Sequence, residues 1–273
     1  MLCGLEIRRE VVIRRASASG AGGIVDFSAH PEGIGFRMFG PPHLVVLGLV
    51  LALNLSLLLL RRVLSEAGRR RFRIGLALLM AVAFAAHVAW RVAIGFWDVR
   101  SDLPLHLCDL TALLSIALLL RRSRWLYGFV YFLGVGGALQ ALVTSNVGIY
   151  GYPHLYFFTS MFLHGAIITT GIYFTVVEGF RPTWRTLWRV AGCMLAYTAV
   201  IFGLNLLMGS NYLFIGRKPD FPSLIDELGP WPWYVLALVG VGLASLFVLY
   251  APFALKDWRA RARGRPGTQL SQK

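Results

Sequence analysis

Seven long apolar stretches constrain the fold of this 273-residue chain more than any other feature. They lie at about 43–60, 74–96, 105–120, 125–143, 155–178, 188–208 and 233–253. Most are close to the roughly 20 residues that a helix needs to cross about 30 Å of hydrocarbon. Outer-membrane strands would instead alternate in polarity over segments of about 10 residues. The pattern therefore predicts an all-α, polytopic transmembrane bundle of about seven spans.

The composition agrees with a membrane location and argues against nucleic acid as a partner. Apolar residues make up 57% of the chain and charged residues 15%, against about half and a quarter in soluble domains. The net charge of +14 would suggest nucleic-acid binding in a soluble protein. Here the basic residues cluster at span ends, as orientation signals and contacts with anionic lipids do. The three cysteines form no disulfide framework or zinc spacing, so we expect no metal and no cofactor.

The chain divides into a leader, a membrane domain and a tail. Residues 1–42 are polar and rich in Gly and Ser, and we expect them to be flexible. They do not read as a cleaved signal peptide, because the first apolar run begins only near His43. The seven-span domain covers 43–253, and a basic tail follows at 254–273.

Arginine is concentrated in every second loop and in the tail. This alternation predicts a cytoplasmic C-terminus and, with seven spans, an external N-terminus. The five arginines of the leader do not fit that orientation. The short third span and the fourth are joined by the tight turn 121–124, which predicts an antiparallel hairpin.

Ionisable side chains at membrane depth are functional candidates, because hydrocarbon does not solvate them. The orientation predicted above brings the polar residues of several spans to the outer half of the bundle. The predicted set is His87, Arg91, Asp102, His106, Cys108, Asp109, Asn146, His164, Asn205 and Asn211. Their convergence predicts one site in that half.

Cys108 is the candidate nucleophile in this set. Asp102 and Pro104 are residues expected at a helix start, and amide dipoles near a helix start favour a thiolate. His106 lies two residues before Cys108 and so points roughly 200° away on a helix. The base must then come from another span, with His164 as the first choice and His87 as the second.

The same residues also allow a purely structural interpretation. His106 can pair with Asp102 or Asp109 in a polar clasp, and Cys108 is then a small buried residue. Arg91 can extend to the outer interface, and a lone membrane histidine such as His164 is often an interhelical contact. The residues alone leave both interpretations open.

Several motifs resemble one family of membrane proteins. They are residues 103–109 (Leu-Pro-Leu-His-Leu-Cys-Asp), His164-Gly165, Asn211-Tyr212 and Lys218-Pro219. Over about 75–250 the chain resembles the YwaF-like family of bacterial integral membrane proteins. That family is similar to animal transmembrane protein 164, an acyltransferase implicated in placing polyunsaturated chains on ether phospholipids, and more remotely to the androgen-induced lipid hydrolases.

The resemblance implies a lipid acyltransferase or hydrolase in the bacterial plasma membrane. Cys108 would be its nucleophile and His164 its base. In our own hypothesis for this reaction, His106, Asp109 or nearby amides would stabilise the oxyanion. Arg91 would hold the phosphate of a phospholipid substrate. We also predict that four further residues of the set bind substrate, namely His87, Asn146, Asn205 and Asn211. The alternatives are a small-solute transporter and a non-catalytic membrane factor.

Overall fold

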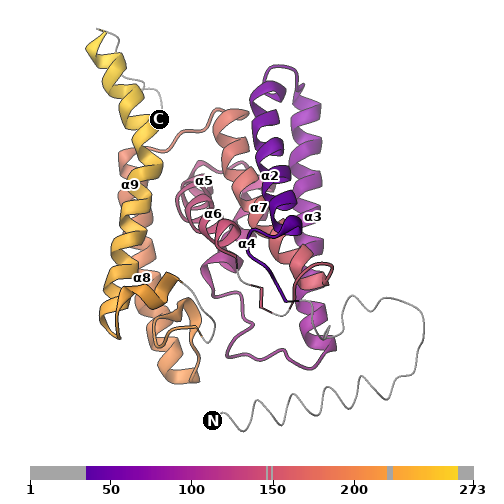
Figure 1. The fold of residues 1–273 in the computed structure, drawn as a ribbon. Helices are drawn as coiled ribbons and strands as arrows, with labels where there is room; N and C mark the ends of the chain where they lie inside the picture. Colours follow the sequence, from indigo (N-terminus) through magenta and orange to yellow (C-terminus); the bar gives the residue numbers. More distant parts are fainter. Residues whose placement is uncertain (1–34, 146, 149, 220–223, 264–273) are drawn as a thin grey trace, which may run out of the picture.

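All secondary structure in the described part of the chain is helical, as the sequence predicts. The computed structural model describes residues 35–145, 147–148, 150–219 and 224–263. The α-helices are α2 (Pro41–Leu60), α3 (Glu66–Ala93), α4 (Leu107–Arg121), α5 (Arg124–Phe129), α6 (Gly136–Val143), α7 (Leu155–Val176), α8 (Trp184–Met208) and α9 (Trp233–Ala262). The π-helix η1 (Val130–Val135) joins α5 to α6, and η2 (Tyr212–Phe214) and η3 (Leu224–Leu228) are 3-10 turns. Figure 1 shows their arrangement.

Within the described ranges, six helices are long and apolar enough to cross a membrane. They are α2, α3, α7, α8, α9 and the continuous rod Arg124–Val143 that α5, η1 and α6 form together. The seventh, α4, has only 15 residues and lies beside this rod as the predicted hairpin partner. The seven predicted apolar stretches therefore correspond to seven helical rods, of which one is short.

Side-chain caps mark where several of the rods begin. Ser65, Ser123 and Thr183 each accept a hydrogen bond from a backbone N–H in the first turn of the helix that follows. Such a cap satisfies one of the amides that a helix start leaves unpaired. At the other end of α8, Gly209 adopts a positive φ of 64°, which residues with a Cβ rarely adopt.

The helix α7 lies at the centre of a bundle with α2, α3, α4 and the α5–η1–α6 rod (Figure 1). Close approach to its neighbours depends on glycine. A Cβ on Gly165 would lie 2.7 Å from Val50 of α2, and one on Gly171 would lie 2.4 Å from Val135 of η1. Small residues allow this contact between membrane helices, where hydrophobicity alone does not drive association.

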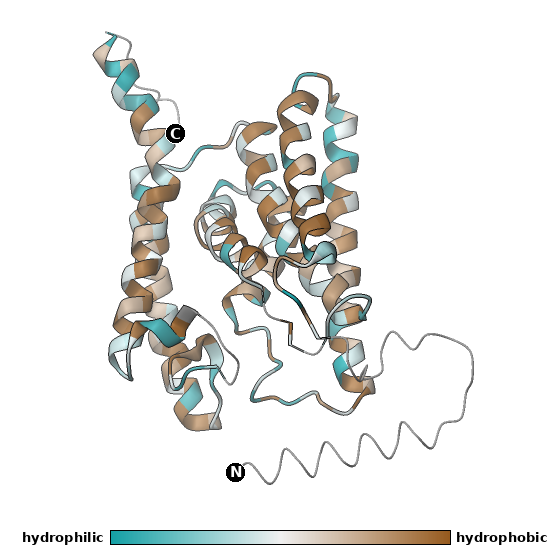
Figure 2. Ribbon diagram, viewed as in Figure 1, coloured by the Kyte–Doolittle hydropathy of each residue, from teal (hydrophilic) through white to brown (hydrophobic). Residues whose placement is uncertain are grey.

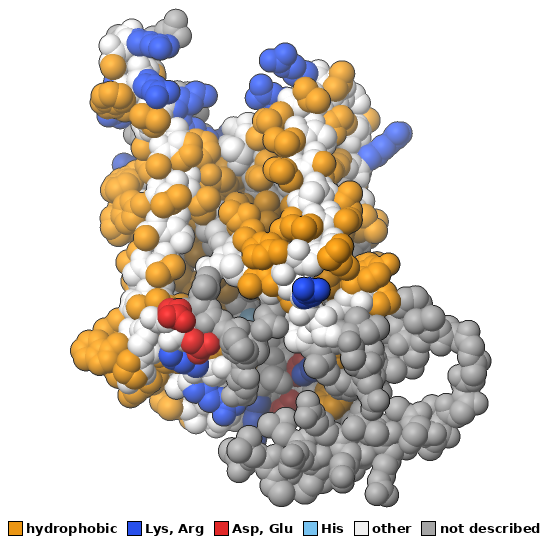
Figure 3. Space-filling model, viewed as in Figure 1, with side chains coloured by type: hydrophobic (Ala, Val, Ile, Leu, Met, Phe, Trp, Pro, Cys, Tyr) orange, Lys and Arg blue, Asp and Glu red, His pale blue; other side chains and the backbone are white. Residues whose placement is uncertain are grey.

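The helices α8 and α9 form a separate pair that touches the bundle mainly through α5, η1 and α6. The Tyr131 hydroxyl donates to the Leu249 carbonyl at 3.0 Å, and Arg181 pairs with Asp257 at 2.5 Å. Figure 3 shows a hollow between the α9 column and the α2–α3 column. At the other end of the pair, the Tyr197 and Tyr212 hydroxyls donate to the carbonyls of Leu105 and Val99 in the connection 94–106.

The outer surfaces have the character expected of a lipid-facing protein. The helix shafts are apolar and their ends polar (Figure 2), and hydrophobic side chains cover the outer face of the helices in Figure 3. Leu49 and Val248 are among the exposed large apolar side chains. The exposed tryptophans lie near the ends of the rods, at positions 97, 231 and 233 on one side and 125, 184, 188 and 258 on the other. Aromatic belts of this kind are typical of the two membrane interfaces. The chain is therefore a multi-pass membrane protein.

The two ends of the bundle differ in charge. We call the end with the turns 61–65, 122–123 and 177–183 and the last turns of α9 the basic end. The opposite end carries the connections 94–106 and 209–232. Which end is cytoplasmic stays a prediction from the arginine pattern.

The predicted leader and tail lie partly outside the described residues, at 1–34 and 264–273. Where the leader is described, it is docked on the bundle. The Phe36 amide donates to the Gly148 carbonyl at 2.8 Å, and the Phe36 ring packs against His43 and Phe157. The tail begins as helix, because α9 continues to Ala262.

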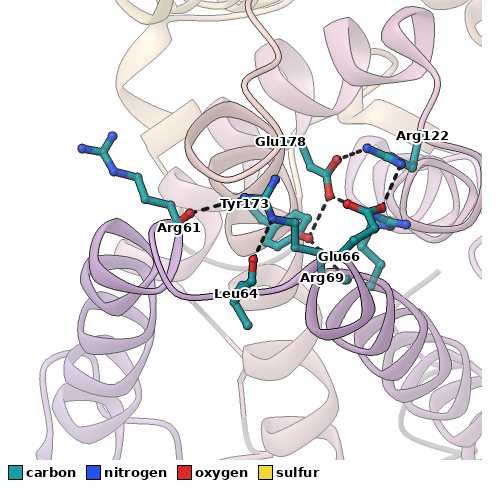
Figure 4. Close-up of polar contacts among 8 residues, drawn as sticks. Arg61, Leu64, Glu66, Arg69, Arg122, Tyr173 and Glu178 are labelled. Carbon is teal, nitrogen blue, oxygen red and sulfur yellow. Dashed lines mark hydrogen bonds and ion pairs between the residues drawn. The ribbon is translucent and has the colours of Figure 1, made fainter.

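A buried ionic network occupies the basic end (Figure 4). The Glu178 side chain is 0% exposed and pairs with Arg73 and Arg122, each at 2.6 Å, while the Tyr173 hydroxyl donates to it at 2.9 Å. Burial alone would raise the pKa of Glu178, but the hydrogen bonds from Tyr173 and the two arginines outweigh it and lower that pKa. The sequence analysis treated these arginines only as orientation signals and missed their shared carboxylate.

Candidate functional site

Cys108 lies at the start of α4, in the half of the bundle opposite the basic end. His106 is the N-cap of α4 and Cys108 its second residue, because the helix begins at Leu107, three positions later than a start at Pro104 would give. The backbone N–H groups of a first helical turn have no partner within their own helix, and they favour negative charge. Among the described residues the Cys108 sulfur has no hydrogen-bond partner, and the side chain is half-buried.

The orientation of His164 on α7 fixes which of its nitrogens can act as a base. Its Nδ1 lies 2.7 Å from the Ser160 carbonyl oxygen. A carbonyl can only accept, so Nδ1 carries the proton and Nε2 of the neutral ring has a free lone pair. Nε2 has no partner within the described ranges, and it is not fully enclosed. This is the state that a general base requires.

A second histidine, His43 of α2, has a hydrogen-bond partner on both ring nitrogens. The Phe39 amide donates to its Nδ1 at 3.0 Å, so Nε2 carries the proton and donates to the Leu142 carbonyl at 2.8 Å. Both nitrogens are therefore occupied by backbone groups. His43 is structural, whereas His164 uses only Nδ1 and keeps Nε2 without a partner in the described part of the chain.

Asp109 connects the start of α4 with α7 and α8. It follows Cys108 directly, and its carboxylate interacts electrostatically with His164 and Tyr156 of α7 and with Tyr197 of α8. Neither carboxylate oxygen has a hydrogen-bond partner in the described part of the chain, and neither is fully enclosed. Since polar groups inside a protein are usually paired, the Asp109 oxygens are a candidate ligand site.

His87 and Arg91 of α3 border the same region. The His87 ring lies 5.2 Å from the Tyr156 ring. Arg91 donates to both Asp102 oxygens, at 2.6 and 2.8 Å, and to the Phe96 carbonyl at 3.1 Å. Its guanidinium is thus largely committed within the protein, which weakens the predicted contact with a head-group phosphate. Burial alone would raise the pKa of Asp102, but its hydrogen bonds, led by those from Arg91, keep that pKa below its usual value.

His106 points away from these residues. Its ring packs 5.2 Å from the Tyr212 ring and 5.1 Å from the Phe214 ring, beyond the end of α8. The predicted clasp with Asp102 or Asp109 is wrong, since within the described residues His106 makes no hydrogen bond to either. Asp102 is instead bound by Arg91.

Two of the three predicted asparagines, Asn205 and Asn211, do not join the cluster of Cys108, Asp109 and His164. Asn205 accepts from the Tyr212 amide and donates to the Tyr212 carbonyl, both at 2.9 Å. Asn211 likewise accepts from the Arg217 amide and donates to its carbonyl. Both amides therefore hold the connection after α8 together and have little capacity left for substrate. Asn146 lies outside the described residues.

The sequence analysis missed Tyr156, which lies among His87, Cys108, Asp109 and Arg91. A signal for it exists in the sequence, because Tyr156, Ser160 and His164 recur every four residues and so share a helix face. Tyrosine is so common in membrane helices that this spacing alone does not point to chemistry.

The fold and the site together define a multi-pass helical membrane protein with a Cys-His-Asp-Tyr cluster in the half opposite its basic end. A model of the TMEM164 family matches residues 38–250, and the chain belongs to that family. The match confirms the predicted relation to transmembrane protein 164, whereas membership of the bacterial YwaF-like subfamily stays a prediction. No curated protein and no solved structure gives a significant match.

Proposed function

We propose that this protein is a lipid acyltransferase or hydrolase in which Cys108 is the nucleophile and His164 the base. The observation that carries the proposal is the hydrogen bond from His164 Nδ1 to the Ser160 carbonyl, at 2.7 Å. It leaves Nε2 open in the same half of the bundle as Cys108, which lies at a helix start. Asp109 lies close enough to His164 to stabilise the imidazolium that forms when the base takes a proton.

The proposed reaction has two steps that share one thioester. His164 Nε2 takes the Cys108 proton, and the sulfur attacks the ester carbonyl of a lipid. The C–S bond forms, the ester C–O bond breaks, and the departing alkoxide takes the proton back from His164. A second lipid hydroxyl or a water molecule then attacks the thioester, His164 accepts its proton, and the Cys108 thiol is restored.

The surroundings of the cluster suit a substrate that arrives from the membrane. Asp109 faces both α7 and α8, and these helices belong to the two parts of the molecule between which Figure 3 shows a hollow. The helices on both sides are apolar on their outer faces. A phospholipid is the substrate class that fits this setting, and the bacterial plasma membrane is the location that the resemblance to the YwaF-like family suggests.

Covalent labelling tests the nucleophile. In a Cys3→Ser, Cys193→Ser background, an acyl-mimicking electrophile should label the detergent-purified protein at Cys108. Cys108→Ala should abolish both labelling and lipid ester turnover, and His164→Gln should lower turnover at least about 100-fold, as for lost general-base catalysis. Cys193 is exposed on α8, so restoring it alone in the Cys108→Ala protein is the matched control for nonspecific labelling.

One result would contradict the proposal directly. If a well-folded Cys108→Ala protein still turns lipid esters over at the original rate, Cys108 is not the nucleophile. Solute uptake into proteoliposomes would then be measured, because a small-solute transporter is the alternative function that a polar cluster inside a membrane bundle supports.

A further inference from the structure

The ring of Tyr156 is held in place from three sides. The centroids of His87, Trp90 and Tyr150 lie 5.2, 5.8 and 5.5 Å from its own. Aromatic rings at these separations pack favourably and restrict one another. The Tyr156 hydroxyl therefore has a fixed position near the start of α7.

That hydroxyl differs from those of three other tyrosines in the molecule. The hydroxyls of Tyr131 and Tyr197 donate to backbone carbonyls at 3.0 and 2.8 Å, and the Tyr127 hydroxyl bonds to Thr175 at 2.9 Å. The Tyr156 hydroxyl has no hydrogen-bond partner among the residues that the structure describes, and it is not fully enclosed. Since buried tyrosine hydroxyls usually find a partner, this one is available to a molecule that enters the site.

The electrostatic interactions of Tyr156 indicate that it lies near the proposed nucleophile. It interacts electrostatically with Cys108 and Asp109 on α4 and with Arg91 on α3. A phenol is neutral at physiological pH, so the Tyr156 hydroxyl carries its proton and can act as a hydrogen-bond donor. A neutral donor fixed beside a nucleophile is the arrangement that stabilises an oxyanion.

We propose that the Tyr156 hydroxyl is the oxyanion donor of this site. It hydrogen-bonds the ester carbonyl oxygen of the substrate and strengthens that bond as Cys108 attacks. The inference rests on the proposed function. When the C–S bond forms, the carbonyl π electrons move to the oxygen that Tyr156 holds. They return when the alkoxide leaves with the proton from His164, and Tyr156 itself neither gains nor loses a proton.

Tyr156→Phe tests this role, because it keeps the ring and removes only the hydroxyl. We expect kcat/KM for lipid ester turnover to fall by about 100-fold or more, the effect of losing one oxyanion donor, with an unchanged melting temperature. The matched control is Tyr131→Phe, which removes a hydroxyl that bonds to α9. It should lower the melting temperature and leave turnover intact. Original turnover in Tyr156→Phe would overturn the inference.

A second probe separates this inference from the proposed function. Iodoacetamide alkylates a thiol by displacement at carbon and creates no oxyanion at a carbonyl. Tyr156→Phe should therefore keep iodoacetamide labelling of Cys108 and lose most labelling by an ester probe. Equal loss with both probes would mean that the hydroxyl acts on the thiol and would contradict an oxyanion role. If Cys108→Ala alone keeps full turnover, the proposed function has failed instead.

Discussion

Glu178 at the basic end and Asp109 in the opposite half are both carboxylates inside the bundle, but they differ in how their oxygens are used. Both Glu178 oxygens are bound, one by Arg73 and Tyr173 and the other by Arg122. Asp109 has no hydrogen-bond partner in the described part of the chain, although it lies near His164. The hydrogen-bonding capacity of Glu178 is therefore used within the protein, whereas that of Asp109 is not.

The difference separates a structural polar cluster from one that can meet a ligand. Charges removed from water cost several kcal/mol each, and only a fully hydrogen-bonded network compensates that cost. The Glu178 network meets this condition across α3, α4 and α7. The Asp109 cluster does not, and its unused atoms are the ones a substrate could bind. The comparison predicts opposite responses to mutation.

The largest loss of stability is expected from Glu178→Ala. It leaves Arg73, whose side chain is only 8% exposed, as an uncompensated buried charge. Breaking a buried pair in this way costs about 3–5 kcal/mol of the free energy of unfolding. Thermal unfolding in detergent measures it, and the site should keep its Cys108 labelling in whatever fraction stays folded.

Glu66→Ala is the control for that prediction. Glu66 also pairs with Arg122, at 3.3 Å, but its side chain is 68% exposed. Exposed pairs contribute little, so the melting temperature should hardly change. Equal losses from Glu66→Ala and Glu178→Ala would contradict the view that burial makes the Glu178 network structural.

Acidification should reveal the same carboxylate. The pKa of Glu178 in the folded protein is below its ordinary value of 4.5, so the unfolded chain binds more protons between the two values. The stability that Glu178 contributes is fully present above about pH 4.5 and is lost as the pH falls through the folded pKa. Melting temperatures measured from pH 7 to pH 3.5 should show this loss, and Glu178→Gln should flatten that part of the profile. A profile unchanged by Glu178→Gln would speak against the network.

The two histidines extend the comparison with an intermediate effect. His43→Ala removes partners from the Phe39 amide and the Leu142 carbonyl and should cost about 2 kcal/mol of stability. His164→Ala removes one bond to a carbonyl that α7 can still use, so it should cost less stability but abolish ester turnover. Melting and turnover measured on both variants check this, and a reversed order would undo the distinction between a structural and a catalytic histidine.

Asp109→Asn should have the smallest effect on stability and a clear effect on activity. The change keeps the shape and removes a charge that no hydrogen bond compensates, so the melting temperature should stay the same or rise slightly. Turnover should fall by about 10-fold or more, because the His164 imidazolium loses its nearby negative charge. A drop in stability like that of Glu178→Ala would show that Asp109 is structural as well.

The sequence predicted the helical rods well, because hydropathy is a local property. All seven apolar stretches are helices, and the hairpin of α4 with the next rod follows from the short turn between them. The close approach of α7 to α2 at Gly165, where a Cβ would meet Val50 at 2.7 Å, depends on the small size of that one residue. None of these features needs knowledge of a distant contact.

Polar pairing could not be predicted in the same way, because it joins residues far apart in the chain. Arg73 and Glu178 are 105 residues apart, and nothing near either one identifies the other. Arg91 lies across a turn from Asp102 and forms the ion pair with it, so Asp102 does not pair with His106 as predicted. Asn205 was predicted to bind substrate, but its amide bonds to the Tyr212 backbone. For the candidate site, sequence reasoning proposed Cys108, Asp109 and His164 but missed Tyr156, and it could not assign the hydrogen bonds of any of them.

The shortness of α4 ties the site to the thickness of the membrane around it. Fifteen residues rise only about 22 Å, some 8 Å less than a typical hydrocarbon core, while α9 with 30 residues exceeds it. The end of α4 at Arg121 is held at the basic end by the pairs of Arg122, so the whole deficit falls at the Cys108 end. Hydrophobic mismatch then sets how far the thiol lies below the head groups. A thinner bilayer brings Cys108 towards the ester linkages of its lipids, and a thicker one leaves it among their acyl chains.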